Sequence, residues 1–226
     1  MTVLPSMGMN TVSRQRVGEK IWTIVVAAGS GSRFGSPKQF SLINERRVVD
    51  WAVETARLAS DGVVVVLPAE QATREGGVVG GATRSASVRS GLAAVPNDAT
   101  IICVHDAARP FASEFLFEEV INAVCAGADG AVPGLPVVDT IKFVGENNVV
   151  VSTPNRRDLI AVQTPQAFRA KTLRQAHAHN PEGTDDSTLV ENHGFRVVVV
   201  NGDPLNRKIT TPEDLNWARA VSRGEV

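Results

Sequence analysis

The stretch TIVVAAGSGSRFGSPK, residues Thr23–Lys38, decides the fold that we expect for this chain. It opens with a continuous apolar run rich in β-branched residues, which is typical of a parallel strand buried on both faces. The run then breaks into a loop that contains three glycines, Gly29, Gly31 and Gly35. Arg33 and Lys38 add two positive charges to that loop. A buried strand followed by a glycine-rich, basic loop predicts a site for a polyphosphate, because exposed backbone N–H groups and fixed cations both bind anions.

The spacing of the glycines in this loop argues against two common kinds of phosphate-binding motif. A dinucleotide-binding fingerprint needs a glycine where Phe34 stands, and the next expected strand, Val63–Leu67, runs into Pro68 rather than into an acid that would hold a ribose. A nicotinamide enzyme is therefore disfavoured. A P-loop is absent as well, because Lys38 follows a proline instead of a glycine. A simple surface turn after a core strand remains the alternative, since glycine-rich loops are common turn chemistry.

Size and composition favour one soluble domain. A chain of 226 residues with 43% hydrophobic content is long enough for a single α/β domain with a sizeable core. The formal net charge of -1 provides no overall basic field, so nucleic-acid binding is not expected and an anionic substrate must be held by local clusters. We expect residues 21–226 to form this domain and residues 1–20 to be a loose N-terminal tail.

The same composition predicts the compartment. No apolar run approaches the roughly 20 residues that a membrane span needs, and the first 20 residues lack the apolar core of a signal peptide. The two cysteines, Cys103 and Cys125, have neither a disulfide framework nor a metal-binding spacing. We therefore expect a cytoplasmic protein with buried free thiols and no membrane partner.

Strand and helix patterns alternate along the chain. Strands are expected over Gly62–Leu67, Val78–Val79, Thr100–Val104, Gly130–Leu135 and Arg196–Asn201. Helices are expected over Val48–Leu58, Thr83–Ala93, Ser113–Ala126 and Ala170–His179, and further ones begin near Thr184 and Thr211. This alternation predicts an α/β fold, namely a doubly wound, mostly parallel nucleotide-binding sheet with helices on both faces.

Two further segments place polar residues at the ends of expected strands. Gly80 and Gly81 precede a helix with Arg84 and Ser87 in or near its first turns, which again presents N–H groups, although a turn and an N-cap explain the pattern equally well. Asp106 follows Thr100–Val104, at the edge where open α/β sheets bind ligands. A carboxylate there is suited to Mg²⁺, which prefers one or two carboxylates plus substrate phosphates. The alternative is a turn acceptor paired with Arg109, and His105 is interpreted as a packed side chain.

The segment Asp139–Thr153 differs from the rest, because two β-prone runs flank Gly145-Glu146-Asn147-Asn148. This pattern predicts a β-hairpin. A hairpin that projects from a parallel fold is often an oligomerisation arm, and an internal edge hairpin is the alternative. Two acids nearer the C-terminus, Asp185 and Asp186, are interpreted as N-cap residues of a helix.

Taken together, these motifs resemble one known family. AAGSGSR, PKQ, GG followed by SV, HDAARPF, DTIK, TPQAF, TDDS and KITTPEDL occur in this order between about Ile24 and Ala220. The set is similar to that of the cytidylyltransferases that act on 2-C-methyl-D-erythritol 4-phosphate in non-mevalonate isoprenoid synthesis. The resemblance implies a nucleotide-binding domain that carries a β-arm, here about residues 139–156, which interlocks two subunits of a homodimer.

The resemblance also assigns roles to individual residues. It implies a CTP site formed by Ala27, Ala28, Gly29, Ser30, Gly31, Gly81 and Ser87. It implies that Arg33, Lys38 and Lys208 are catalytic cations and that Asp106 is a catalytic residue that serves Mg²⁺ or another divalent cation. The acceptor phosphate is expected at Arg109, Thr140, Arg156 and Thr164, some of them from the partner's arm. Related enzymes often have a polar residue where this chain has Ala82, so base contacts are expected from the Gly81 backbone.

The implied reaction is transfer of CMP from CTP to 2-C-methyl-D-erythritol 4-phosphate, which gives 4-diphosphocytidyl-2-C-methyl-D-erythritol and pyrophosphate. A ribitol 5-phosphate cytidylyltransferase shares the glycine loop and much of the Asp106 motif. Ala27-Ala28-Gly29, where that group tends to have A-G-G, and the DTIK motif at Asp139–Lys142 favour methylerythritol phosphate. A non-catalytic nucleotide-binding subunit is a third possibility, but such a subunit is expected to lose some of Arg33, Lys38, Asp106 and Lys208.

Overall fold

The computed structural model describes residues 18–31 and 34–225. The predicted N-terminal tail lies mostly outside the described residues, and so does Arg33. The strands are β1 Ile21–Val26, β2 Leu42–Ile43, β3 Arg46–Arg47, β4 Gly62–Leu67, β5 Val78–Val79, β6 Ile101–Asp106, β7 Gly130–Pro136, β8 Phe143–Val144, β9 Val150–Ser152, β10 Ile160–Val162, β11 Gln166–Arg169 and β12 Val197–Asn201. The α-helices are α2 Val48–Ala59, α3 Ala69–Glu75, α4 Arg84–Ala94, α5 Glu114–Cys125, α6 Ala170–Ala176, α7 Asp186–Glu191 and α8 Pro212–Ser222. Short 3₁₀ helices are η1 Lys38–Phe40, η2 Glu146–Asn148 and η3 Arg156–Asp158.

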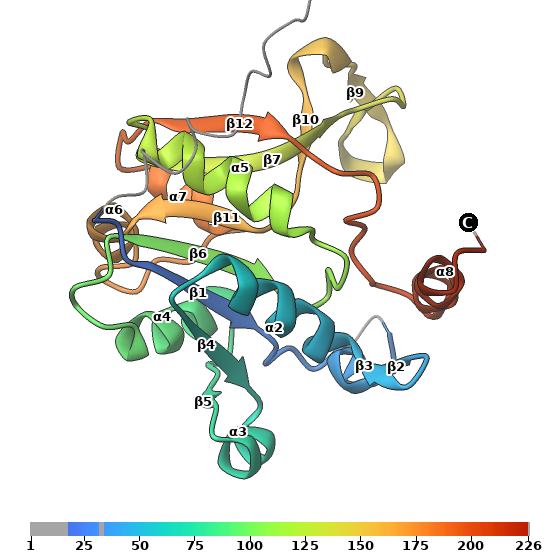
Figure 1. Ribbon diagram of the computed structural model, residues 1–226. Coiled ribbons are helices and arrows are strands. Elements are labelled where there is room, and N and C mark those ends of the chain that lie inside the picture. The colour runs from blue at the N-terminus through green and yellow to red at the C-terminus, as the bar shows by residue number, and fades with distance from the viewer. Residues whose placement is uncertain (1–17, 32–33, 226) are drawn as a thin grey trace, which may run out of the picture.

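The main sheet is built around β1, which lies between β4 and β6 and runs parallel to both. β5 continues the parallel sheet beyond β4, and β12 pairs in parallel with β7 on the far side. β11 interrupts this order, because it pairs antiparallel with both β6 and β7 (Figure 1). The mostly parallel sheet is confirmed, whereas β11 was not predicted. That strand has four residues between Pro165 and the start of α6, too short a run to show a strand periodicity.

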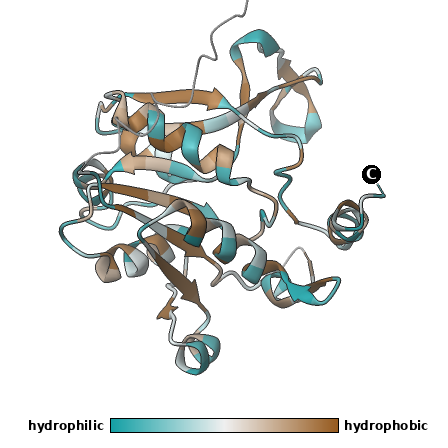
Figure 2. Ribbon diagram, viewed as in Figure 1, coloured by the Kyte–Doolittle hydropathy of each residue, from teal (hydrophilic) through white to brown (hydrophobic). Residues whose placement is uncertain are grey.

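Helices cover both faces of this sheet, as predicted. On one face, α2 and α5 pack Ala52, Ala56, Phe117 and Ile121 against the strands. On the other face, α4, α6 and α7 contribute Val88, Leu173 and Val190. The hydropathy colouring of Figure 2 shows the central strands as mostly hydrophobic ribbons between these two helical layers. A sheet covered on both faces explains why its strands are continuous runs of apolar residues instead of alternating ones.

Predicted helix positions agree closely with the structure. α2, α4 and α5 begin and end within one residue of the predicted ranges. α6 is shorter than predicted, because it ends at Ala176. α3, which follows Pro68, was not predicted. The helices in the described ranges reach at most 12 residues in α2 and α5, and none is long and apolar enough to span a membrane.

The segment that leads into the C-terminal helix α8 carries Lys208 and is hydrogen-bonded to the loop after β6. Thr211 and Asp214 form a capping box at its start, and Pro212 occupies the first turn, as the sequence predicts. Ile209, which is fully buried, donates its N–H to Ala108 O at 2.8 Å. This bond joins the segment that carries Lys208 to the loop after β6.

The predicted hairpin is present as β8 and β9, which pair antiparallel around η2. It projects from the main body beside β10 (Figure 1). Large hydrophobic side chains on it are exposed, including Phe143 at 60% and Val151 at 69%. A hairpin that leaves such side chains in water within one chain is typical of a surface that another protein covers.

Candidate active site

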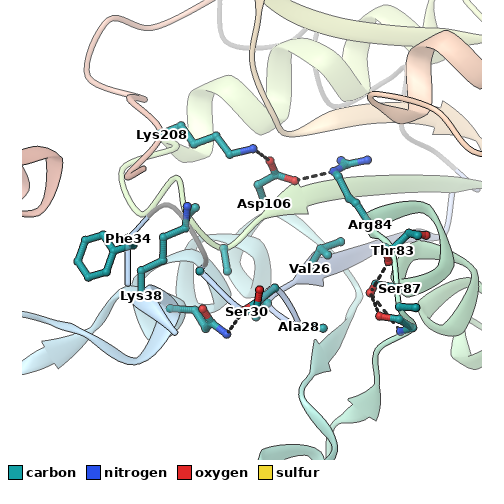
Figure 3. A pocket seen from close by; sticks show the side chains of 18 residues that line it. Val26, Ala28, Ser30, Phe34, Lys38, Thr83, Arg84, Ser87, Asp106 and Lys208 are labelled. Carbon is teal, nitrogen blue, oxygen red and sulfur yellow. Dashed lines mark hydrogen bonds and ion pairs between the residues drawn. The ribbon is translucent and has the colours of Figure 1, made fainter. Parts of the chain in front are cut away.

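A cavity of about 450 Å³ opens at the carboxyl ends of β1 and β6 (Figure 3). Four segments line it: the loop after β1, the start of α4, the end of β6 and the segment with Lys208. All the predicted nucleotide-binding residues are among its lining residues, namely Ala27, Ala28, Gly29, Ser30, Gly31, Gly81 and Ser87. Of the predicted catalytic residues, Lys38, Asp106 and Lys208 also line it, and Arg33 lies outside the described residues. The fold therefore brings together residues that are far apart in the sequence.

The glycine loop has a conformation that depends on Gly31. Its φ is +70°, and a Cβ atom there would lie 1.9 Å from the carbonyl oxygen of Ser36. Gln39, which is buried, donates from Nε2 to Gly29 O at 2.9 Å and so fixes the other end of the loop. The PKQ motif thus supports the loop through Gln39 and places Lys38 in the cavity wall.

The second pair of glycines is fixed by Ser87 from within α4. Its hydroxyl oxygen lies 3.2 Å from Gly81 N, which donates to it, and it donates to Thr83 O at 2.9 Å. A Cβ atom on Gly80 would lie 2.2 Å from the Ala28 side chain, so the two glycine segments are in close contact. Ser87 is almost fully buried, which makes it a support for the Gly81 backbone as well as a wall of the cavity.

Asp106 lies at the centre of the charged groups in the cavity. Its Oδ2 accepts from Lys208 Nζ at 2.6 Å, and its Oδ1 accepts from Arg84 Nε at 3.1 Å (Figure 3). Burial alone would raise the pKa of this carboxyl, but Arg84, Lys208 and Arg109 outweigh burial and hold the pKa of Asp106 well below its usual value. The cavity therefore contains a carboxylate that is ionised at neutral pH and lies between two cations.

A hydrogen-bonded chain behind Asp106 fixes its backbone. Asp106 N donates to Thr164 Oγ1 at 3.0 Å, and Thr164 Oγ1 lies 3.1 Å from His105 Nδ1. Burial lowers the pKa of His105 to about 4, so the ring is neutral at neutral pH. Because His105 Nε2 lies 3.1 Å from Arg109 O, an acceptor, we assign the proton to Nε2, and Nδ1 accepts from the Thr164 hydroxyl. In this structure the Thr164 hydroxyl thus accepts from Asp106 N, which orients the backbone of Asp106, and donates its one hydrogen to His105.

The four residues predicted to bind the acceptor lie outside the cavity lining. The Arg109 guanidinium donates to Asn206 O at 2.7 Å, and burial lowers its pKa. Thr140 lies just before β8 and Arg156 begins η3 after β9; both are exposed, and Arg156 donates to Val138 O. The roles of these residues and of Thr164 in acceptor binding stay predictions.

The donor set of the cavity fits a metal that is bound mainly by substrate. Within the described residues no three His, Cys, Asp or Glu side chains are grouped as a metal site, and Asp106 is the one acid among the lining residues. A carboxylate offers about four lone-pair positions, and Lys208 and Arg84 occupy two of them. A single carboxylate suits Mg²⁺, which completes its coordination with phosphate oxygens and water.

Arg84 and Asp186 are the site residues whose roles sequence reasoning missed. Arg84 begins α4 directly after its N-cap Thr83, and its Nη1 lies 2.8 Å from Asp186 Oδ2. The interpretation of Asp186 as a cap was wrong, because only Asp185 caps α7 while Asp186 is buried beside Arg84 and His177. No local pattern distinguishes two adjacent acids at a helix start, so the sequence held no signal for this difference.

Comparisons with known proteins agree with this geometry. The family model of IspD, 2-C-methyl-D-erythritol 4-phosphate cytidylyltransferase, matches residues 21–223. The enzyme of that name from Nocardia farcinica is 44% identical over 214 residues, which cover 88% of this chain and 92% of the relative. The crystal structure of the enzyme from Thermus thermophilus has a TM-score of 0.77 and 35% identity, and the match covers 90% of this chain and 99% of that one.

Some relatives are longer. A bifunctional enzyme IspD/IspF from Solidesulfovibrio magneticus is 42% identical over 223 residues, which cover 86% of this chain and 55% of the relative. This chain therefore spans about half the length of the bifunctional relatives that it matches. The family model matches nearly all of the described residues, and a relative of the same name is 44% identical over 88% of this chain, so the chain belongs to the 2-C-methyl-D-erythritol 4-phosphate cytidylyltransferase family.

Proposed function

We propose that this protein transfers CMP from CTP to 2-C-methyl-D-erythritol 4-phosphate, with release of pyrophosphate, as a step in isoprenoid precursor synthesis. The observation that carries the proposal is the cavity, in which two glycine segments face Lys38, Lys208 and Asp106 in a chain of this family. The glycine segments suit the nucleotide, and the cations suit its triphosphate.

The chemistry is a displacement at phosphorus. An oxygen of the acceptor phosphate forms a bond to the α-phosphorus of CTP, and the bond from that phosphorus to the bridging oxygen of pyrophosphate breaks. The acceptor phosphate is already ionised, so no side-chain nucleophile is needed. The main barrier is repulsion between two anions. Lys38 and Lys208 both line the cavity, which supports a role in offsetting the negative charge of the transition state. The assignment of Arg33 to the same role rests on the family resemblance.

We further propose that Asp106 holds Mg²⁺ or another divalent cation. When bound, that ion supplies neutralisation of phosphate charge and polarisation of the α-phosphate. Asp106 contributes a carboxylate whose pKa lies well below its usual value, so it needs no deprotonation to bind the ion. Thr164 keeps the backbone of Asp106 oriented toward the cavity.

A homodimer through the hairpin is the third part of the proposal. The hairpin exposes Phe143, Val144, Val149, Val150 and Val151, which a second copy of the chain would cover. Thr140 and Arg156 lie on either side of the hairpin in sequence and outside the lining of their own chain's cavity, which favours a role in the partner's acceptor site. The two cysteines are not joined in a disulfide, which fits a reducing compartment such as the cytoplasm.

Mixed dimers test whether the site is shared. Lys38→Ala and Arg156→Ala are each expected to lose most activity, but co-refolded mixtures are expected to recover part of it. In a mixed dimer one of the two sites receives an intact Lys38 and an intact Arg156 from the partner. The measurement is pyrophosphate release as the ratio of the two variants changes, with size-exclusion chromatography to confirm exchange. If subunits exchange but the activity of the mixture does not exceed the summed activities of the two single variants, a shared site is contradicted.

The proposed function itself is tested by pyrophosphate release in the presence of Mg²⁺. We expect release with CTP and 2-C-methyl-D-erythritol 4-phosphate, little with ribitol 5-phosphate, and little with ATP, GTP or UTP. Chelation of the metal with EDTA is expected to stop it. A preference for ribitol 5-phosphate would keep the mechanism and change the acceptor. CTP binding without turnover on either acceptor would favour a non-catalytic nucleotide-binding subunit.

A further inference from the structure

The Arg84 side chain connects the cavity to a buried carboxylate behind it. Its Nε lies 3.1 Å from Asp106 Oδ1, and its Nη1 lies 2.8 Å from Asp186 Oδ2. Asp186 is 1% exposed and does not line the cavity, and its other oxygen lies 2.9 Å from His177 Nε2. Arg84 is thus held between a carboxylate in the cavity and one in the core.

The two cations that contact Asp106 differ in how firmly they are held. Lys208 reaches Asp106 through one ammonium group on a flexible side chain that is 37% exposed. Arg84 has a planar guanidinium, is 25% exposed, and is bound to a carboxylate on each side. A cation that approaches Asp106 will therefore displace Lys208 more easily than Arg84.

The charges of this group balance. Lys208 and Arg84 contribute +2, and Asp106 and Asp186 contribute −2, so the four together are neutral. Asp186 in effect balances Arg84, which leaves the charge of Asp106 to be balanced by the exchangeable Lys208. Without Asp186 the group would carry +1, and Arg84 would have Asp106 as its remaining carboxylate.

We propose that Asp186 is a positioning residue that holds Arg84 away from full pairing with Asp106, so that Asp106 stays available to a divalent cation while Lys208 is released to the triphosphate. His177 supports it by holding the second oxygen of Asp186. Asp186 touches neither nucleotide nor metal in this arrangement. The inference rests on the proposed function, since it concerns binding of metal and CTP at the cavity.

The test is calorimetric titration of CTP into the full chain without acceptor, once with excess Mg²⁺ and once with EDTA. In the wild-type protein Mg²⁺ is expected to strengthen CTP binding. In Asp186→Asn, Arg84 competes with the divalent cation for Asp106. The ratio of CTP affinity with Mg²⁺ to CTP affinity with EDTA is therefore expected to fall about tenfold, within the range of coupling between charges in one network. A purely structural role would change both titrations equally and leave their ratio unchanged.

Asp185→Asn is the matched control. Asp185 is the adjacent acid on the same helix and contacts Thr188 and Gln166 but not Arg84, so the control is expected to keep the wild-type ratio. The paired variant Arg84→Gln with Asp186→Asn removes both charges together. In this paired variant Mg²⁺ is expected to strengthen CTP binding as it does in the wild-type protein. If Asp186→Asn alone does not fold, the paired variant is measured in its place.

The outcomes separate the two proposals. If the wild-type chain binds no CTP under either condition, the proposed function is overturned and this inference falls with it. If the wild-type chain binds CTP more tightly with Mg²⁺ but Asp186→Asn keeps the same ratio as Asp185→Asn, the inference alone is overturned. A paired variant that stays as weak in its response to Mg²⁺ as Asp186→Asn also overturns it.

Discussion

Replacement of Lys38 by alanine is expected to lower the turnover number by about 10²–10³-fold, the usual loss when one preorganised group that stabilises transition-state charge is removed. Lys38 begins η1 directly after the glycine loop, and its side chain extends into the cavity from the side opposite Lys208 (Figure 3). In the proposed complex with CTP, this position would place its charge beside the triphosphate. The measurement is steady-state pyrophosphate release at saturating CTP and acceptor.

Lys171→Ala is the control for this prediction. Lys171 lies on α6, is exposed, and is absent from the cavity lining, so its replacement removes the same charge without effect on turnover. Circular dichroism and a melting curve verify that both variants fold. A Lys38→Ala protein that turns over at near the wild-type rate would remove Lys38 from the catalytic residues.

Replacement of Asp106 by asparagine is expected to reduce turnover by at least about 10²-fold and to abolish most of the response to Mg²⁺. The change keeps the shape of the side chain but removes the one carboxylate that lines the cavity. Without it, Lys208 and Arg84 lose a shared partner, and the proposed divalent cation would lose its protein ligand. The measurement is the initial rate as a function of Mg²⁺ concentration at saturating CTP.

Asp98→Asn makes the same chemical change at a surface ion pair with Lys20 and is expected to leave the rate and the Mg²⁺ response unchanged. Surface ion pairs of this kind contribute little to stability. The control therefore separates the loss of a carboxylate from the cavity from the loss of a carboxylate elsewhere in the chain. An Asp106→Asn protein with a normal Mg²⁺ response would show that the metal is bound by substrate alone.

Most helices and strands of the main sheet were predictable because their signals are local. The valine-rich runs of β1 and β4, the glycines that end β1 and β5, and the capping box at Thr211 each lie within a few residues. Strand β11 could not be predicted from local signals. Its position between β6 and β7 comes from pairing with strands 30 or more residues away, which a four-residue run does not encode.

The candidate site divides in the same way. The glycine loop and Lys38 are adjacent in sequence, so their common place in the wall of the cavity could be predicted from one motif. The partners of Asp106 could not be predicted from one motif, because Lys208 lies 102 residues and Arg84 lies 22 residues from it in the sequence. Thr164 was assigned to the acceptor by resemblance, and only the structure places its hydroxyl between Asp106 N and His105.

By itself the sequence determined the doubly wound sheet, the glycine-rich loop after β1 and membership of a nucleotidyltransferase family, because periodicity, glycine placement and ordered motifs are properties of short stretches. Only the tertiary structure decided which charges meet. Asp185 and Asp186 are neighbours with the same side chain, yet one caps a helix and the other is buried against Arg84. The energy of a charge depends on burial and on its nearest partners, and both are set by how distant elements pack.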